Sequence, residues 1–597
     1  MQRKTLVIFA LILLLAFAIR FQNIESVFSK PILPSGYDPY YQIRLAEVIV
    51  KSGYRPQFDY YLNYPYGLKI GWLPLFSYVL AIPGFIGFKD VAAFDVVLPV
   101  ILGLISTVLV YLITAKIFNN DYIALISSLF FAICPAVVSI SMLGFADHHI
   151  WNLMLILFAA YFILYKDFKV LISGVFLTLL AFSWVGSPIY AALLALCALM
   201  LDLENSKQIA YQAIAFAIPS VSFVLNKFLG FTFLALSIFI ILGHLIKRKG
   251  FLIHYIAACA AVISIAYFLP FKELSFLKAG INYLLSRNIY LPTIVEAQSF
   301  QVFAIISNSG YFIFLMALPS LIIAKNRFLS TWFISAIFLA LLQLRFADIL
   351  SIPVSILSAY TLAIFLDKMG YPVFPQNEEH ERRIKFRAKT SRKKSKKEEK
   401  KKEYKVKIKD TLILLVVVGY LIAPAIILCK YPFTMNKDWR DALLWIKDNT
   451  EKTSYYLTPD KGKPEYSIMS WWDYGNWIVY LANRPVVCNN FQAGAVDAAK
   501  FFTAQDEKTA IKIAKKRTVK YVITAQEMGL DLESLSGKFI AIMQIAGLKP
   551  KFMNKNEITD FYNNSMFYKL HIENAKTLKH FKLIKDFGSV KVFKVVY

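Results

Sequence analysis

The sequence contains little cysteine and little charge for its length. Five cysteines are scattered through 597 residues, and four of them (Cys134, Cys197, Cys259 and Cys429) stand in apolar runs, where cysteine behaves as a small hydrophobic residue. This excludes a disulfide framework and leaves the redox compartment open. Charged residues make up 18% of the chain and hydrophobic residues 57%, against roughly 25% and 45–50% in soluble globular proteins. A fully soluble protein is therefore excluded.

Acidic residues are the scarcer kind of charge. The chain has 39 Asp and Glu against 66 Lys and Arg, which gives a formal net charge of +27. Such an excess would suggest a nucleic-acid binder if it were spread over a soluble surface. It is concentrated instead, because residues 378–409 hold 16 basic and 6 acidic side chains. We expect a solvated cytoplasmic loop near anionic lipid at this stretch, and no nucleic-acid partner.

The apolar residues fall in runs that match membrane spans. The first run resembles a signal peptide but lacks a small-residue cleavage site, so we expect it to be an uncleaved span. A bilayer core of about 30 Å requires about 20 apolar residues per helix, and we predict about thirteen spans on this basis. The runs lie near residues 5–20, 95–116, 121–141, 150–165, 168–185, 187–201, 208–224, 230–246, 251–270, 302–323, 328–344, 349–366 and 410–429.

Basic residues occupy alternate loops, as the positive-inside rule requires when the N-terminus lies inside. An odd number of spans then places residues 430–597 on the outer face. We predict a multi-pass protein of the cell membrane, with a transmembrane domain at 1–429 and a mixed α/β extracytoplasmic domain at 430–597. The transmembrane domain would carry large outer loops at 21–94 and 271–301 and a basic cytoplasmic loop at 367–409.

The C-terminal segment has the polar composition of a soluble domain. Helix-like patterns lie at 438–448 and 506–517, and short β-like runs lie at 485–488, 519–524 and 589–596. Its length is sufficient for one α/β domain.

Carboxylates and an arginine mark the predicted outer loops. Asp38 stands in GYDPYYQIR, Glu296 in LPTIVEAQ and Arg345 in QLRFAD. Each has an ordinary explanation by itself, because an Asp before Pro is usually a turn residue, a loop Glu is usually solvated, and an Arg at a helix end often anchors the interface. All three residues lie on the same predicted face of the membrane, although more than 300 residues of sequence separate the first from the last. This coincidence favours one composite site.

The string GFADHHIW places Asp147, His148 and His149 at the edge of a predicted span. An Asp and a His two positions apart in an extended segment project to the same side and can ligate one cation, although a polar loop end is the plainer alternative. Carboxylates with one imidazole suit Mn²⁺ or Mg²⁺, whereas Zn²⁺ would be expected to use more His or Cys. Together with Arg345, which suits phosphate, the pattern indicates a phosphorylated substrate.

The string SWWDYGNWI at 470–478 is rare. Indole N–H groups only donate hydrogen bonds and a carboxylate accepts them, so Trp471, Trp472 and Asp473 can surround one hydroxyl group. An aromatic anchor at the membrane interface is the alternative.

At these motifs the sequence resembles the catalytic subunit of asparagine-linked oligosaccharyltransferase, here most similar to the archaeal single-subunit form. WWDYG at 471–475 matches the family signature, YDPYY around Asp38 the first acidic motif, DHH at 147–149 the second, and TIVE at 293–296 the fifth-loop motif. Arg345-Phe346 matches the position whose Arg contacts the lipid pyrophosphate. The resemblance covers essentially the whole chain and implies a GT-C type membrane domain of thirteen spans followed by an outer-face domain.

The resemblance implies transfer of a glycan from a dolichol-type lipid-linked (pyro)phosphate donor to the Asn nitrogen of an acceptor polypeptide, at Asn-x-Ser/Thr, with inversion. It implies a single subunit in contact with membrane lipid. Asp38 and Glu296 would be catalytic, accepting hydrogen bonds from the acceptor amide. Asp38, Asp147 and His149 would hold Mn²⁺ or Mg²⁺. The other implied roles are donor phosphate binding by His148, Arg345 and Lys69, and an acceptor Ser/Thr pocket made of Trp471, Trp472, Asp473, Lys538 and Ile542.

One family element departs from the pattern. The second hydroxyl-pocket motif, Asp-x-x-Lys-x-x-x-Met/Ile, corresponds to LSGKFIAI at 535–542, in which Leu535 replaces the Asp. Lys538 and Ile542 share a helix face. The missing Asp leaves the role of Lys538 open, whereas Ile542 can still contact a Thr methyl group.

Two alternatives remain. Another polyprenyl-phosphate-sugar-dependent GT-C glycosyltransferase would explain the acidic loops and the metal, but it gives no reason for WWDYG. A secondary transporter would place ionisable residues near the middle of the bilayer and show repeat symmetry. Here the charged groups lie at span ends and no internal repeat is apparent.

Overall fold

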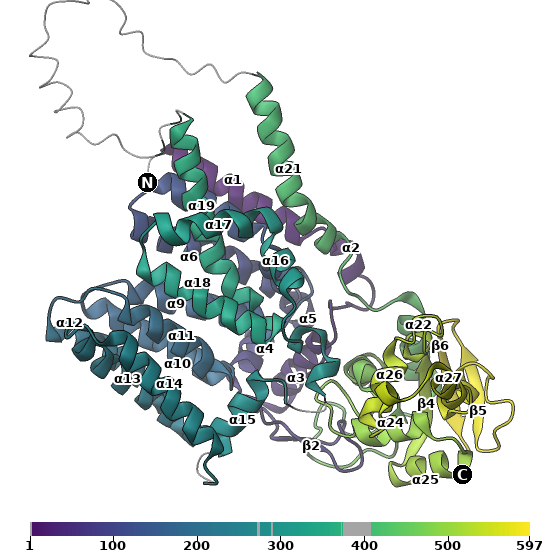
Figure 1. Ribbon diagram of the computed structural model, residues 1–597. Coiled ribbons are helices and arrows are strands. Elements are labelled where there is room, and N and C mark those ends of the chain that lie inside the picture. The colour runs from purple at the N-terminus through teal and green to yellow at the C-terminus, as the bar shows by residue number, and fades with distance from the viewer. Residues whose placement is uncertain (1–2, 272–274, 288–289, 370, 372, 374–407) are drawn as a thin grey trace, which may run out of the picture.

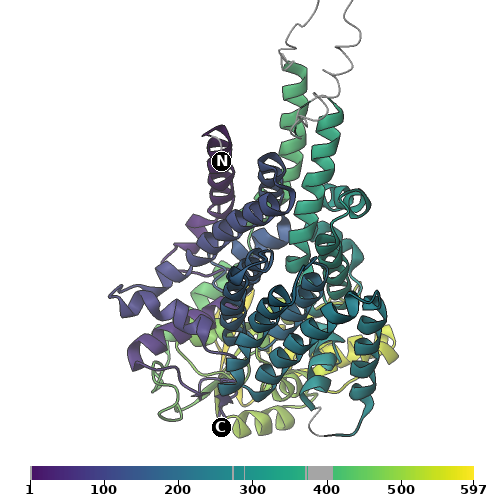
Figure 2. The ribbon, with the colours of Figure 1, turned by 90° about the vertical axis from the view of Figure 1, so that its left-hand side faces the viewer.

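The computed structural model describes residues 3–271, 275–287, 290–369, 371, 373 and 408–597. A helical part extends to residue 430, and a mixed α/β domain, green to yellow in Figure 1, packs beside one end of it. The N-terminal end of α1 and the C-terminus lie at opposite ends of the molecule in both Figure 1 and Figure 2. The predicted succession of a helical and a globular part is thus confirmed. The basic loop predicted at 367–409 falls almost entirely outside the described residues.

A helix or a pair of consecutive helices occupies each of the thirteen apolar runs. They are α1 (Arg3–Arg20), α6 (Leu98–Phe118), α7 (Asp121–Ala132) with α8 (Pro135–Ser141), α9 (His148–Ile163), α10 (Leu171–Ser183), α11 (Ser187–Leu199), α12 (Ser206–Ala217), α13 (Lys227–Lys247), α14 (Leu252–Phe268), α16 (Val302–Ser309) with α17 (Tyr311–Ile323), α18 (Arg327–Leu342), α19 (Ala347–Lys368) and α21 (Ile408–Lys430).

The presence of a helix in each apolar run does not by itself give the number of membrane spans. Among the described residues, three helical segments are long and apolar enough to cross a membrane, or five if each bent pair counts as one span. The pair α7 and α8 bends by 61°, and the pair α16 and α17 by 93°. The run at 302–323 is therefore not one straight helix, because Gly310, with φ of 78°, turns the chain between α16 and α17. The count of thirteen is not confirmed and stays a prediction.

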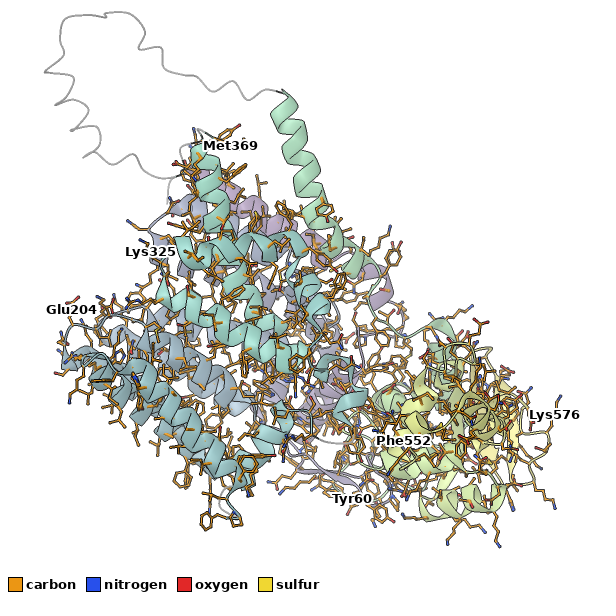
Figure 3. The ribbon with its side chains drawn as sticks, in the orientation of Figure 1. Tyr60, Glu204, Lys325, Met369, Phe552 and Lys576 are labelled. Atoms are coloured by element: carbon orange, nitrogen blue, oxygen red, sulfur yellow. The ribbon has the colours of Figure 1, made fainter. Side chains whose placement is uncertain are left out.

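Apolar side chains cover the outside of the helical part. No side chain of α14 is buried, and Ile253 and Phe268 on this helix are 81% and 80% exposed. Exposed apolar surface on this scale is typical of helices that face lipid. In Figure 3, Met369 lies at one end of the helical part and Tyr60 at the other, beside the C-terminal domain.

The predicted outer loops are largely folded. Loop one, which we define as residues 21–94, contains α2 (Ile24–Val27), α3 (Asp38–Ser52), the hairpin β1 (Phe58–Asp59) and β2 (Leu68–Lys69), α4 (Leu75–Phe85) and the start of α5 (Val91–Asp95). The second loop contains α15 (Ser275–Leu284) and the 3₁₀ turns η4 (Leu291–Thr293) and η5 (Val295–Ala297).

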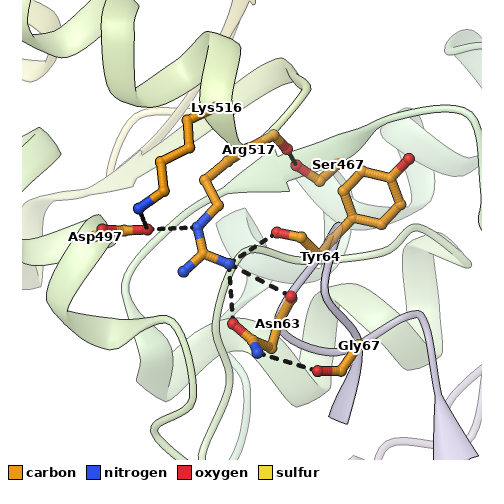
Figure 4. A network of polar contacts seen from close by, with 7 residues as sticks. All are labelled: Asn63, Tyr64, Gly67, Ser467, Asp497, Lys516 and Arg517. Atoms are coloured by element: carbon orange, nitrogen blue, oxygen red, sulfur yellow. Dashed lines mark hydrogen bonds and ion pairs between the residues drawn. The ribbon is translucent and has the colours of Figure 1, made fainter.

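Buried polar contacts join loop one to the C-terminal domain. Arg44 forms an ion pair of 2.6 Å with Asp59, both fully buried, and its other amino group donates to the Tyr456 carbonyl at 3.0 Å. Arg517 donates to the Asn63 side chain at 2.9 Å and the Tyr64 carbonyl at 3.0 Å, as Figure 4 shows. These contacts fix loop one against the domain that carries WWDYG.

The C-terminal domain is built on a four-stranded sheet of order β3-β4-β6-β5, in which β3 and β4 are parallel and the other neighbours antiparallel. Helices expected at 438–448 and 506–517 are observed as α22 and α25, and strands expected at 519–524 and 589–596 as β4 and β6. The elements are α22 (Lys437–Asn449), β3 (Ser467–Met469), η7 (Trp472–Tyr474), α23 (Gly475–Trp477), η8 (Ile478–Ala482), α24 (Ala495–Thr503), α25 (Glu507–Lys516), β4 (Val519–Ala525), η9 (Gln526–Met528), α26 (Lys538–Ile545), η10 (Pro550–Phe552), α27 (Lys555–Asn563), α28 (Met566–His571), β5 (Phe581–Asp586) and β6 (Val590–Val595).

The β-like run at 485–488 is not a strand, and the prediction there was wrong. It forms one isolated bridge, between Val486 and Ile468. Its backbone groups are divided between two partners, since Val486 bonds to loop one at Tyr61 and Tyr64 while Val487 bonds to Ile468. A segment shared in this way cannot form a regular ladder with either neighbour.

Candidate active site

One cavity of about 340 Å³ gathers polar residues from four distant segments. The segments are the start of α3, the start of α9, the turn η5 and the turn η6 (Leu344–Phe346) that precedes α19. The predicted site residues in its wall are Asp38, Asp147, His148, His149, Glu296 and Arg345. The composite site expected from the sequence is therefore assembled by the fold.

Asp147 caps the N-terminus of α9, and this cap orders the two histidines. Its Oδ1 accepts hydrogen bonds from the backbone N–H of His148 and from the His148 ring, both at 2.7 Å. Its Oδ2 lies 3.8 Å from Nε2 of His149. One carboxylate thus holds both imidazoles at the start of the helix.

Asp38 is the first residue of α3. Pro39 follows it in the first turn, where the fixed φ of proline favours the helix and its missing N–H costs no intrahelical hydrogen bond. Burial and the nearby carboxylates of Asp147 and Glu296 raise the pKa of Asp38 to about 7. The Asn476 amide donates to Asp38 Oδ1 at 3.1 Å. The carboxylates therefore lie close enough to disfavour a second negative charge, which is the situation that a bound cation relieves.

Glu296 and Arg345 both line the cavity and form an ion pair. Nη2 of Arg345 lies 3.2 Å from Oε1 of Glu296, and Nη1 of Arg345 bonds to the hydroxyl of Tyr283 on α15. The Glu296 side chain is half exposed, whereas Arg345 is mostly buried. A substrate phosphate would therefore meet an arginine that is already oriented by two protein groups.

The cavity also contains polar residues that sequence reasoning missed. Asp348 is buried at the start of α19 and accepts hydrogen bonds of 3.1 and 3.2 Å from Tyr190 on α11. Gln42 and Asn152 complete this polar wall, each with a buried side-chain oxygen that has no partner among the described residues. Asp348 stands three residues after Arg345, in the QLRFAD string, so a helix-start carboxylate there was a usable signal.

Lys69 lies outside this cavity. It is exposed at the end of β2, where the hairpin pairs it with Phe58. The register of the β1–β2 hairpin thus directs this lysine to the surface, and its role in phosphate binding stays a prediction.

The signature residues of the C-terminal domain form a second polar cluster. Lys538, at the start of α26, lies 2.8 Å from Asp473 and donates to the Tyr474 hydroxyl at 3.0 Å. Glu527 accepts from the Tyr474 hydroxyl at 3.0 Å and lies 3.6 Å from Lys538. Glu527 thus supplies a carboxylate near Lys538 in a chain where Leu535 replaces the motif Asp. Nothing in the local sequence pattern indicated that Glu527 would lie near Lys538.

The aromatic part of this cluster is closely packed. Trp471 and Trp472 meet edge to face with ring centroids 6.0 Å apart, and both are buried. The Trp472 indole N–H is buried and has no hydrogen-bond partner among the described residues. Ile542 is a fully buried residue of α26, and its contact with a Thr methyl group stays a prediction.

The residues present fit a divalent cation. The ligand atoms of Asp147, His148 and His149 lie within 4.8 Å of one another, and Asp38 lines the same cavity. The compact group contains His148 in place of Asp38 of the predicted set, because the helix cap holds His148 against Asp147. One carboxylate with one imidazole suits Mn²⁺, and the second imidazole brings the group closer than the predicted set to the ligands that Zn²⁺ uses.

Two family models match the chain. The N-terminal model of oligosaccharyl transferase STT3 covers residues 5–373, and the AglB core domain model covers residues 436–529. The dolichyl-phosphooligosaccharide-protein glycotransferase 2 of Archaeoglobus fulgidus is 46% identical over 100% of this chain and 99% of its own length.

Solved structures share the fold. Archaeal oligosaccharyltransferase AglB from Archaeoglobus fulgidus, in complex with an inhibitory peptide and a dolichol-phosphate, gives a TM-score of 0.77 at 22% identity, covering 98% of this chain and 79% of that one. An Archaeoglobus fulgidus oligosaccharyltransferase in complex with Zn and sulfate gives 0.70 at 21% identity, covering 97% and 78%. The full-length relative and the family models confirm the resemblance seen in the motifs: the chain belongs to the STT3 and AglB family of oligosaccharyltransferases.

Proposed function

We propose that this chain transfers a glycan from a dolichol-type lipid-linked (pyro)phosphate donor to the amide nitrogen of Asn in Asn-x-Ser/Thr sequons. The observation that carries the proposal is the cavity that joins Asp38, Glu296 and Arg345, in which Asp38 accepts a hydrogen bond from Asn476, the residue that follows WWDYG. The family to which the chain belongs supports the same reaction. The chain is accordingly a glycosyltransferase that acts on protein.

The acceptor amide is the difficult reactant, because its nitrogen lone pair is delocalised into the carbonyl group. Asp38 and Glu296 would accept hydrogen bonds from its two N–H groups, weaken that delocalisation and align the nitrogen with the anomeric carbon. Oδ1 of Asp38 already accepts from Asn476, so Oδ2 is the atom that would face the acceptor or the metal. Direct displacement of the phosphate by the nitrogen inverts the anomeric centre.

Asp38, Asp147 and His149 are proposed to hold a divalent cation, with Mn²⁺ or Mg²⁺ as the physiological candidates. Such a cation supplies Lewis-acid stabilisation of the departing phosphate when it is bound. His148, oriented by Asp147, and Arg345 would add donors to the phosphate oxygens, and Lys69 is a candidate for a more distant contact. A structural relative was obtained with Zn and sulfate, which supports a cation and an oxyanion in this fold.

The acceptor pocket would read the hydroxyl group at the +2 position. Asp473 would accept from the Ser or Thr hydroxyl, and the free Trp472 N–H would donate to it, with Trp471 packed behind. Lys538 would hold Asp473 in place, and Ile542 would contact a Thr methyl group. An Asn-x-Ala peptide would leave these polar groups unpaired and would therefore be rejected.

We further propose the membrane arrangement predicted above: thirteen spans within residues 1–429, a location in the cell membrane, and residues 430–597 with the catalytic face outside. The opposite placement of Met369 and Tyr60 supports this orientation, because the basic stretch follows Met369 and loop one contacts the C-terminal domain. The chain would act as a single subunit.

The test is transfer of glycan from a lipid-linked donor to an Asn-x-Thr peptide by the purified protein with Mn²⁺, beside an Asn-x-Ala peptide. We expect transfer to the first peptide alone. We expect Asp147→Ala to abolish turnover and to lose metal dependence, while Lys69→Ala retains most activity. Near-normal, metal-dependent transfer by Asp147→Ala would show that the site is assigned wrongly.

A further inference from the structure

Asn476 makes a direct link between the C-terminal domain and the cavity. It follows the WWDYG string on α23, and its side-chain Nδ2 donates to Oδ1 of Asp38 at 3.1 Å. The Asn476 side chain is fully buried. Buried polar groups are costly unless paired, so this amide and this carboxylate depend on each other.

A second amide sets the direction of that hydrogen bond. Asn489 donates from Nδ2 to Oδ1 of Asn476 at 2.7 Å, and Asn489 is itself fully buried. Because the Asn476 oxygen is occupied by a donor, its NH₂ group must point the other way, toward Asp38. Oδ1 of Asn489 accepts from the backbone N–H of Phe491, whose ring lines the cavity.

The glycine of WWDYG allows the two asparagines to meet. A Cβ atom at Gly475 would lie 2.4 Å from the Cys488 carbonyl oxygen and 2.5 Å from Cα of Asn489. Any larger residue would push the 488–489 segment away and separate Asn489 from Asn476. The same helix holds the chain just before Asp38, since the Trp477 indole donates to the Gly36 carbonyl at 3.0 Å.

We propose that Asn476, oriented by Asn489, is a positioning residue for Asp38. It occupies Oδ1 of the carboxylate, so that Oδ2 would be the oxygen left for a cation or the acceptor amide. The segment that carries the acceptor pocket and the carboxylate of the cavity then form one rigid unit, joined through two amides. This inference rests on the proposed function, because it assigns Asp38 to the metal site.

The experiment uses the full-length protein in detergent, with direct Mn²⁺ binding followed by the electron paramagnetic resonance signal of free Mn²⁺. The variants are Asn476→Ala, Asn476→Leu, which keeps the volume without a donor, and Asn489→Ala, with Asn449→Ala at the exposed end of α22 as the matched control. Loss of a partner that orients a metal ligand typically weakens metal binding by about 10–100-fold. We expect that loss in both Asn476 variants, a smaller loss in Asn489→Ala, and none in the control.

Steady-state turnover distinguishes a positioning role of Asn476 toward Asp38 from a role in packing alone. We expect kcat to fall with Mn²⁺ affinity in the Asn476 variants while KM for an Asn-x-Thr peptide stays within about twofold, because the Asp473 pocket remains intact. Thermal unfolding of each variant checks that the fold is retained. If an Asn476 variant does not fold, Asn489→Ala, which keeps the donor to Asp38, provides the test of the positioning role.

Asp38→Ala separates the positioning role of Asn476 from the proposed metal site. If Asp38→Ala loses Mn²⁺ binding but the Asn476 variants bind Mn²⁺ within twofold of the wild type, the positioning role is overturned and the proposed function stands. If Asp38→Ala binds Mn²⁺ like the wild type, the metal assignment and the positioning role both fail.

Discussion

Single residues that looked isolated in the sequence are paired in the structure. Lys538 is the clearest case, because Leu535 stands where the family has an Asp. The structure places Lys538 between Asp473 and Glu527, so its charge is balanced from a different segment. Lys538, whose role the sequence left open, is an ion-pair partner of Asp473, the carboxylate of the proposed acceptor pocket.

Replacing Lys538 by Met tests this pairing. Without the ammonium group, Asp473 loses a charged hydrogen bond of about 1.5–3 kcal/mol and its orientation toward the acceptor hydroxyl. We expect KM for an Asn-x-Thr peptide to rise about tenfold or more with little change in kcat, measured by steady-state transfer. Lys512→Met, on the exposed face of α25, should leave KM unchanged. An unaltered KM in Lys538→Met would remove the lysine from the pocket.

A buried histidine makes the C-terminal domain sensitive to acid. Burial and the nearby Lys591 lower the pKa of His571 to about 4, and the ring bonds to Thr524 at 2.9 Å. The unfolded chain, with a His pKa of about 6.5, binds a proton before the folded one does. Stability is therefore full above pH 6.5 and falls as the pH drops toward 4, by about 3 kcal/mol in total.

The melting temperature of the protein between pH 7 and pH 4 measures this effect. His571→Gln, which cannot take up the proton, should show a flatter pH profile than the wild type. Identical slopes for the two proteins would assign the acid sensitivity to other groups.

At the scale of elements, a buried arginine of the C-terminal domain satisfies the carbonyl groups at the end of helix α22. α22 ends at Asn449, and Arg484 donates to the carbonyls of Lys447 and Thr450 at 3.1 and 3.0 Å. This arginine is buried and also bonds to the Tyr466 hydroxyl at 2.9 Å. A cation at the C-terminus of a helix satisfies its last carbonyls and complements its dipole.

Arg484→Leu should destabilise the protein by about 3 kcal/mol, because several buried carbonyls lose their donor at once. The measurement is denaturant unfolding followed by tryptophan fluorescence, to which Trp439 and Trp445 of the same helix contribute among the nine tryptophans of the chain. Arg440→Leu is the matched control. Among the described residues, the side chain of Arg440 pairs with Asp441 at the surface, with the two side chains 32% and 36% exposed, and such pairs contribute about 0–1 kcal/mol. Equal losses in both variants would contradict the capping role.

At the scale of the whole molecule, loop one is the connection between the membrane part and the C-terminal domain. It supplies Asp38 to the cavity. It is fixed to the domain by Arg44, which donates to the Tyr456 carbonyl, and by Arg517, which donates to Asn63 (Figure 4). We therefore expect the relative position of the cavity and the proposed acceptor pocket to depend on the docking of loop one.

Arg517→Ala should loosen this docking. Asp497 would keep its contact with Lys516, but Asn63 and Tyr64 would lose their donor from the domain. We expect limited proteolysis to cut within residues 54–74 several-fold faster than in the wild type, with reduced turnover. Lys516→Ala removes the neighbouring cation on the same carboxylate without touching loop one, and it should digest like the wild type. Equal digestion of Arg517→Ala and the wild type would show that the network does not hold loop one.

The sequence by itself determined the helices, the order of the two parts and most of the candidate site. Apolar runs report local helices directly, which is why all thirteen runs contain helices. The strings around Asp38, Asp147, Glu296, Arg345 and Trp471 were recognisable because each motif is contiguous.

Only the tertiary structure decided which of these residues meet. It placed Lys69 outside the cavity, bent the chain at Gly310, divided the backbone bonds of 485–488 between two partners, and brought Asn476 and Glu527 to the site. The physical reason is that contacts across hundreds of residues depend on how helices and loops pack. A hydrogen bond such as that from Asn476 to Asp38 leaves no periodicity or spacing in the sequence.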